Sequence, residues 1–254
     1  MLKTFLPKSN HILKLSGIFS LKIFILLGSL ASMISCAEQF NISGDSSVST
    51  LDGRMLYLKA PSSQTVMRSI DSCEVVHGKF KFIGMVDSTI MGEIFMDNEG
   101  FMPIVIEQGN ISISISNTEQ RVMGSLLNNR LYRFLEQKSR MEEEIINLSN
   151  QEAEMILGGV HPAIAHKKMS ERTNKLYSAL EDLEINFITT NSNNILGTTF
   201  FNVLCSQYPY PIMTAQIEKI IKQSCPSFKK QSCVRDYIEA AKTNMRMIQQ
   251  AGKQ

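Results

Sequence analysis

The sequence is poor in several residue types, and each shortage excludes a class of function. It has no tryptophan and only 7% aromatic residues, so a stacking platform for sugars is poorly supplied. Its histidines, His11, His77, His161 and His166, do not have the spacing of a metal site. The sequence contains no phosphate loop, dinucleotide fingerprint or glycine-framed serine nucleophile. We therefore expect no cofactor, no metal and no catalytic residue, and we favour a protein that is not an enzyme.

An excess of one charge is also missing. The 254 residues have a net charge of +2, but the first 35 contain four lysines and no acidic residue. The remaining 219 residues carry 22 basic and 24 acidic side chains, a net charge of −2. A near-neutral body without a basic stripe argues against nucleic-acid binding. The composition, 43% hydrophobic and 20% charged, is typical of a chain that folds around a core.

The apolar run near the N-terminus, residues 23–34, is short. Its 12 residues are fewer than the ~20 that a spanning helix needs, and they follow a basic segment, as in a secretory signal. The run ends at Met33-Ile34-Ser35-Cys36, which resembles the lipobox of bacterial lipoproteins. The resemblance implies that a signal peptide of residues 1–35 is removed and that Cys36 is the lipid attachment site. An ordinary secreted protein and a retained membrane anchor are the alternatives.

Residues 38–117 have the pattern of short strands. The strict alternation of Ile111-Ser112-Ile113-Ser114-Ile115 predicts a strand with one buried face. His77-Gly78 predicts a two-residue turn between neighbouring strands, and residues 103–107 are expected to pair with residues 111–115. The seven predicted strands are residues 40–42, 55–59, 72–76, 79–82, 93–96, 103–107 and 111–115. We therefore predict an antiparallel β-sandwich-like domain over residues 36–117.

Beyond residue 117 the hydrophobic period becomes helical. Leu127 to Leu148 and Met169 to Phe187 form two apolar stripes, of which the first is interrupted by Lys138. Glycines and a proline at residues 158–162 predict a break between two antiparallel helices. Further helices are predicted at residues 195–207 and 214–223 and after Pro226, so the α+β fold ends in a helical region of about five helices, residues 118–254. Packing within the chain is favoured over a coiled-coil partner for the stripes, which are short.

The order of these parts, together with three sequence patterns, resembles a known family. The patterns are Phe40-x-Ile-x-Gly44, Leu51-Asp-Gly-Arg-Met-Leu-Tyr-Leu58 and Val76-His-Gly-Lys-Phe-Lys-Phe-x-Gly84. They are similar to the uncharacterised N-terminal domain of Bacteroidetes lipoproteins related to thiol–disulfide reductases. In that family a thioredoxin-like domain with a Cys-x-x-Cys motif usually follows the helices, and this sequence has no such motif. The resemblance therefore implies the non-catalytic module, without the reductase activity.

Two small groups of residues remain as candidate sites. Cys225 and Cys233 lie eight residues apart, so a disulfide between them would close a short loop; free buried thiols and a redox-active pair are the alternatives. Cys73 and Cys205 are most simply core residues. The final group, Tyr208 and Tyr210, alternates with prolines and predicts either an exposed partner-binding loop or a plain turn between helices.

These observations favour a membrane-anchored lipoprotein of the cell envelope, facing the periplasm, that binds a protein or peptide without catalysis. The expected partners are the membrane, through the N-terminal lipid, and an envelope protein or peptide, with no nucleic acid. An accessory component or truncated form of a thioredoxin-like thiol–disulfide reductase is the alternative. A subunit that oligomerises through its helical stripes is a third hypothesis.

Overall fold

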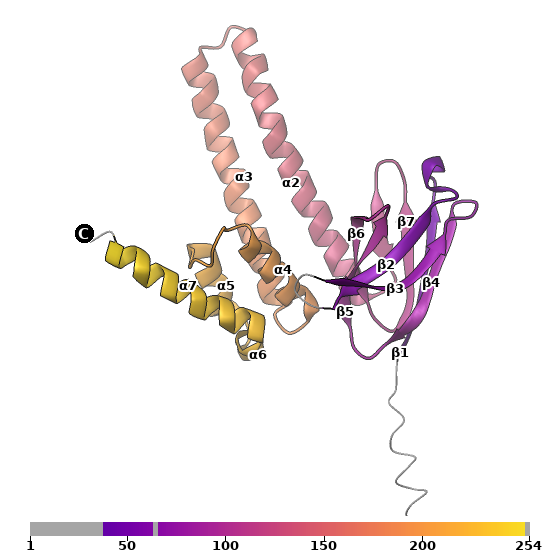
Figure 1. The fold of residues 1–254 in the computed structure, drawn as a ribbon. Helices are drawn as coiled ribbons and strands as arrows, with labels where there is room; N and C mark the ends of the chain where they lie inside the picture. The colour runs from indigo at the N-terminus through magenta and orange to yellow at the C-terminus, as the bar shows by residue number, and fades with distance from the viewer. Residues whose placement is uncertain (1–37, 63–65, 252–254) are drawn as a thin grey trace, which may run out of the picture. The chain divides into compact units, whose positions relative to one another are not determined.

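The computed structural model describes residues 38–62 and 66–251, so the predicted signal peptide and Cys36 lie outside the described residues. The described residues form eight β-strands followed by six α-helices (Figure 1). The predicted α+β class is therefore confirmed. Within these residues, no helix combines the length and the hydrophobicity that crossing a membrane requires.

The eight strands form a sandwich of two four-stranded sheets. The first sheet has the strand order β4-β1-β7-β8, and the second has the order β3-β2-β5-β6. The strands are β1 Glu38–Ser46, β2 Met55–Pro61, β3 Met67–Glu74, β4 Lys79–Val86, β5 Ile90–Met96, β6 Glu99–Ile106, β7 Gly109–Ile115 and β8 Gln120–Met123. Alternate apolar residues of both sheets meet in one core; Ile111, Ile113 and Ile115 of β7 lie in it, as the alternation predicted.

Two strand pairings expected from the sequence are wrong. His77 and Gly78 do form a tight turn, with φ angles of 51° and 72°, and Val76 bridges Lys79. The turn nevertheless passes from β3 in one sheet to β4 in the other. Likewise β6 does not pair with β7, which runs parallel to β1 and antiparallel to β8. A tight turn reverses the chain locally, but the choice of strand partner depends on which apolar faces meet in the core. One sheet is therefore mixed rather than purely antiparallel.

The β1–β4 ladder explains two of the sequence patterns. Phe40 lies opposite Gly84, and Gly44 lies opposite Phe80. A Cβ atom on either glycine would overlap the phenylalanine ring that covers it. Each ring therefore lies over a neighbouring strand where no side chain stands, an arrangement that compensates for glycine in a sheet. The Phe-x-Ile-x-Gly spacing thus reflects packing inside the sandwich.

The helices are α2 Leu126–Leu157, α3 Pro162–Thr190, α4 Ile195–Ser206, α5 Ala215–Gln223, α6 Pro226–Lys230 and α7 Ser232–Ala251. The first two form the expected long antiparallel hairpin (Figure 1). Lys138, which interrupts the apolar stripe of α2, lies 2.7 Å from Glu184 of α3. Glu184 also accepts a hydrogen bond of 2.9 Å from Gln216 of α5. The interruption is therefore a polar link among three helices.

A small aromatic cluster joins the sandwich to the helices. Phe134 of α2 stacks on Phe187 of α3 with ring centroids 4.0 Å apart, and Phe200 of α4 meets both rings edge-on. Val105 of β6 and Leu196 of α4 belong to the same buried cluster. The start of the helical region is therefore packed onto the edge of one sheet.

Candidate functional site

The outer edge of β6 is closed by a side chain from α2. The amide group of Asn128 donates to the Val105 carbonyl at 2.8 Å and accepts from the Val105 N–H at 2.9 Å. Asn128 is fully buried, and the Ser125 hydroxyl, the N-cap of α2, accepts from its side-chain NH₂ at 2.8 Å and from its backbone N–H at 3.2 Å. Asn128 thus takes the place of a neighbouring strand at the β6 edge.

Pro103 lies two residues before Val105 on the same edge of β6. Its backbone needs only one hydrogen-bond partner, because proline has no N–H. The Tyr132 hydroxyl donates to the Pro103 carbonyl at 2.9 Å. Burial raises the pKa of Tyr132 well above its ordinary value, so the hydroxyl stays protonated and remains a donor. Together, Asn128 and Tyr132 close the β6 edge over Pro103 and Val105.

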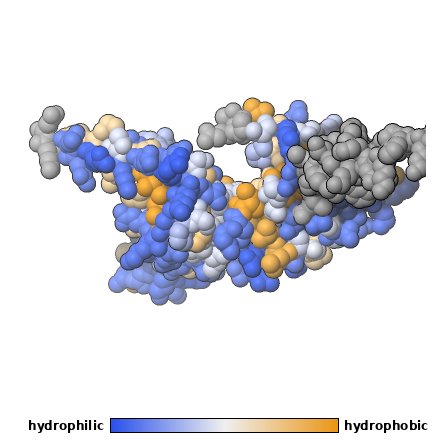
Figure 2. All heavy atoms as spheres, turned by 90° about the horizontal axis from the view of Figure 1, so that it is seen from below, coloured by the Kyte–Doolittle hydropathy of each residue, from blue (hydrophilic) through white to orange (hydrophobic). Residues whose placement is uncertain are grey.

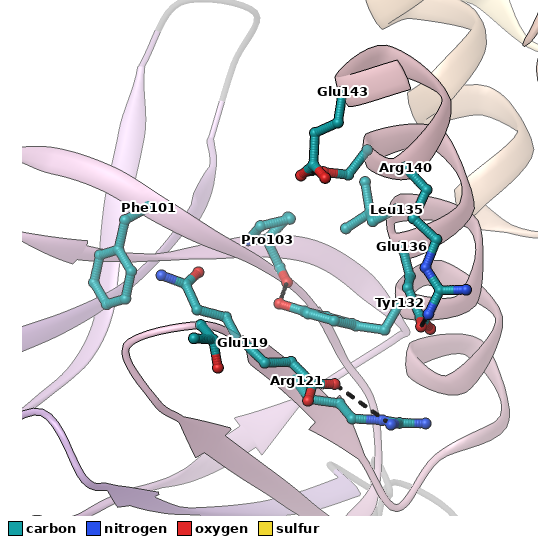
Figure 3. Close-up of a pocket in the computed structure, with 12 residues that line it drawn as sticks. Phe101, Pro103, Glu119, Arg121, Tyr132, Leu135, Glu136, Arg140 and Glu143 are labelled. Carbon is teal, nitrogen blue, oxygen red and sulfur yellow. Dashed lines mark hydrogen bonds and ion pairs between the residues drawn. The ribbon is translucent and has the colours of Figure 1, made fainter. Parts of the chain in front are cut away.

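Past Pro103 the structure opens into a cleft, which we name the α2 cleft. It has a volume of about 720 Å³ and lies between β6, β8 with the loop before it, and the first half of α2 (Figure 3). Phe101, Pro103, Tyr132 and Leu135 give it apolar surface. The strands β6 and β8 are terminal in their sheets, and no strand of the described residues pairs with the outer edge of either one. The cleft is therefore bordered by two sheet edges and a helix.

Charged side chains of both signs surround this apolar surface. Arg121 lies 3.5 Å from Glu119, and Arg140 lies 2.5 Å from Glu136 (Figure 3). Glu143 lines the same cleft one turn further along α2. Exposed ion pairs of this kind contribute little to stability, so their members can exchange partners with charges of a ligand at small cost. The cleft can therefore bind a segment that carries both apolar and charged groups.

The candidate cysteines lie at the opposite end of the helical region. Cys225 precedes α6, Cys233 lies in the first turn of α7, and both pack against the cluster that buries Cys205 of α4. Each of these thiols is free, as is Cys73 in β3. The disulfide between Cys225 and Cys233 stays a prediction.

The three clustered thiols differ in acidity. Hydrogen bonding from the Ser192 and Ser227 side chains lowers the pKa of the Cys225 thiol to about 7. Burial raises the pKa of the Cys205 thiol to about 12, with Tyr237 and Cys233 next to it. Cys225 therefore has the properties of a reactive thiol and Cys205 those of a core residue. The described residues contain no cluster of three histidine, cysteine or acidic side chains that could hold a metal ion.

The two candidate tyrosines have different surroundings. Tyr208 is half-buried against the cluster around Cys205, whereas Tyr210 is 51% exposed. Tyr237 of α7 holds the same loop by exchanging hydrogen bonds with the backbone of Ile212, and Asn244 donates to the Pro211 carbonyl at 2.8 Å. The loop is thus fixed to α7, and only Tyr210 offers an aromatic surface to a partner.

Sequence reasoning missed the α2 cleft. Its residues come from three segments, and β8 was not predicted because it has only four residues, of which Val122 alone is buried. One signal was present in Pro103, since a proline inside a strand pattern points to a sheet edge. That signal locates the edge, but the helix that covers it is identified only by the tertiary structure.

Residues 40–131 match the sequence model of a family described as "Domain of unknown function (DUF4369)". The match covers nearly all of the sandwich and the first turns of α2, including Asn128. No curated protein matches this chain.

Proposed function

We propose that this protein is a lipid-anchored lipoprotein of the bacterial cell envelope that binds an extended protein or peptide segment and catalyses no reaction. The observation that carries the proposal is the α2 cleft, an open cavity of about 720 Å³ bordered by the edges of β6 and β8. Extended peptides commonly bind by adding to a sheet edge, where main-chain hydrogen bonds supply affinity and neighbouring side chains supply specificity.

The lining favours a peptide over a small apolar ligand. Phe101 and Tyr132 offer aromatic surface, while Arg121 and Arg140 can bind carboxylates and three glutamates can bind basic groups. Small-molecule sites are mostly apolar and enclose their ligand, whereas this cleft is open and carries five charged side chains. A chain with mixed side chains and a polar backbone fits such a lining.

The anchor is supported by the lipobox pattern that ends at Cys36. Acylation by two or more chains would hold the protein at a membrane, where a single chain gives only marginal binding. The intact mass of the protein from native membranes tests this part. We expect the mass of residues 36–254 plus acyl chains, and an unacylated or uncleaved chain would contradict the anchor.

The binding proposal is tested by site-specific photo-crosslinking in cells. Ser139 faces the α2 cleft, and Asn147 is another exposed residue further along the same helix, outside the cleft. With a photoreactive residue at each position in turn, we expect crosslinks to a protein segment from position 139 and none from position 147. Equal capture from both positions would contradict the cleft as the site.

A synthetic peptide that spans the crosslinked segment then provides a direct measurement. We expect Arg121→Glu combined with Arg140→Glu to weaken its binding to the full chain about tenfold, because two favourable charge contacts become repulsive. Lys167→Glu combined with Lys168→Glu, on the exposed surface of α3, serves as the matched control. Unchanged binding in the cleft variant would overturn the proposal.

A second candidate function, an accessory component of a thiol–disulfide system, is favoured by Cys225 alone. Its partly exposed thiol, with a pKa of about 7, is half ionised at neutral pH and can attack a disulfide. Incubation of the full chain with oxidised glutathione tests this function. A mixed disulfide at Cys225 that resolves through Cys233 would support it, and an unmodified Cys225 would contradict it.

A further inference from the structure

The C-terminal helices form a second hollow, the α5–α7 groove, which has no part in the proposed peptide cleft. It has a volume of about 590 Å³ and an apolar floor of Met213, Ile221, Ile238 and Met245. The strip of hydrophobic residues at this end of the molecule lies among hydrophilic neighbours when seen from below (Figure 2).

The rim of the groove is positively charged. Lys222 of α5 and Lys242 and Arg246 of α7 line it, with Glu218 as the one acidic side chain of its lining. None of the three basic residues forms an ion pair within residues 38–62 and 66–251. An apolar floor with unpaired basic groups on its rim matches an apolar surface flanked by acidic groups.

The spacing of the lining residues indicates the shape of the occupant. On α7 they are Ile238, Lys242, Met245, Arg246 and Gln249, which form one continuous face of the helix. The apolar stripe of this helix is buried at Val234 and Ala241 but 48% exposed at Ile248. The second half of α7 therefore presents a helical face that no element of the described residues covers. Two helices that line the same groove can accept a third helix between their ridges.

We propose that the α5–α7 groove docks one amphipathic α-helix of a partner protein, with an apolar stripe flanked by acidic side chains. The flexible side chains of Met213 and Met245 can adapt to the apolar residues of such a stripe. A flat membrane surface would meet the basic rim but would not reach a floor that lies between two helices. A second copy of this chain would bring the same basic rim against the first, so that like charges would face each other.

Two designed helical peptides test the proposal on the full chain. Both carry the same leucine stripe, which is flanked by glutamates in one peptide and by lysines in the other. With the methionine methyl groups isotope-labelled, we expect the glutamate peptide to shift the resonances of Met213 and Met245. Met169, a buried residue of α3 that does not line the groove, should not shift. The lysine peptide should bind at least about tenfold more weakly.

Charge reversal in the groove gives the matched comparison. Lys242→Glu combined with Arg246→Glu should weaken the glutamate peptide about tenfold and favour the lysine peptide, while Lys167→Glu combined with Lys168→Glu changes neither. Equal binding of the two peptides would overturn the proposal. Binding to anionic vesicles that depends on Lys242, or a dimer whose interface shifts Met213 and Met245, would also overturn it. None of these outcomes depends on the α2 cleft, so the two proposals fail independently.

Discussion

The sandwich and the C-terminal helices differ in how far their exposed surfaces are covered by other parts of the chain. The sandwich closes parts of its sheet edges with side chains of the same chain: Asn128 covers the β6 edge at Val105, and the Ile83 N–H of β4 donates to the Asp71 carboxylate at 2.9 Å. The C-terminal helices leave an apolar floor between α5 and α7 open and hold a reactive thiol near the surface.

This difference follows from the cost of each kind of exposure. An unpaired sheet edge invites pairing with another chain, and its buried polar groups cost free energy unless they are bonded. An amphipathic helix satisfies its own backbone and can leave part of its apolar face uncovered at a smaller cost. The two proposed binding surfaces therefore lie beside α2, where it follows the sandwich, and between α5 and α7.

The largest expected effect tests the core of the sandwich. Phe82 of β4 is fully buried, whereas its neighbour Ile83 faces the other side of the strand and is 48% exposed. Phe82→Ala should lower the free energy of unfolding by about 3–5 kcal/mol, because it leaves a cavity. Ile83→Ala should cost less than about 1 kcal/mol. Urea denaturation measures both, and equal losses would contradict a core closed on one side of β4.

The next effect sharpens the contrast between two thiols of the helical region. At pH 7 about half of Cys225 is thiolate, whereas Cys205, with a pKa of about 12, is almost wholly protonated. Alkylation of Cys225 by iodoacetamide should be at least about 100-fold faster, even though a thiolate of lower pKa is the weaker nucleophile. Peptide mass spectrometry over pH 5–10 measures this, with a midpoint near pH 7 for Cys225.

The same experiment has a matched pair of variants. The Ser227 hydroxyl lies 3.0 Å from the Cys225 sulfur. Ser227→Ala should move the midpoint to higher pH, since it removes a hydrogen bond that stabilises the thiolate. Ser178→Ala, on the exposed face of α3, should leave it unchanged. A midpoint near pH 9 in the unaltered protein would contradict the lowered pKa of the Cys225 thiol.

A third prediction breaks the closure of the β6 edge. Asn128→Ala removes the partner of both the N–H and the carbonyl of Val105 and should cost about 2–4 kcal/mol. Asn129→Ala changes the adjacent, exposed asparagine and should cost less than about 0.5 kcal/mol. Unfolding curves, together with hydrogen exchange of the Val105 amide, measure the effect. Unchanged protection of that amide would show that Asn128 does not cap the strand.

The smallest effect concerns the second cap of that edge. Tyr132→Phe removes the hydrogen bond to the Pro103 carbonyl but keeps the ring, so the expected loss is about 0.5–1.5 kcal/mol. Tyr177→Phe, on the exposed surface of α3, is the control and should have no measurable effect. Thermal unfolding compares the two. If both variants have the same melting temperature, the Tyr132 hydroxyl does not close the edge.

Many of the helices and strands could be predicted from the sequence, because the hydrophobic patterns that indicate them are local. The 3.6-residue period placed the long helices, and the predicted break before Pro162 separates α2 from α3. The strict alternation of residues 111–115 identified the buried face of β7. It did not identify the strand that β7 pairs with, since alternation describes one strand at a time. The pairing of β7 with β1 joins residues about 70 positions apart.

By itself, the sequence determined the α+β class, the buried face of β7 and the apolar stripes of the two long helices, because hydrophobic spacing acts over a few residues. The tertiary structure alone decided which strands pair, which side chains close the sheet edges and which thiols share one core. Asn128 caps a strand 23 residues earlier in the chain, and the Cys225 N–H donates to the hydroxyl of Ser192, 33 residues away. The α2 cleft and the α5–α7 groove belong to this second group, since each is formed by segments that only packing of the folded chain brings together.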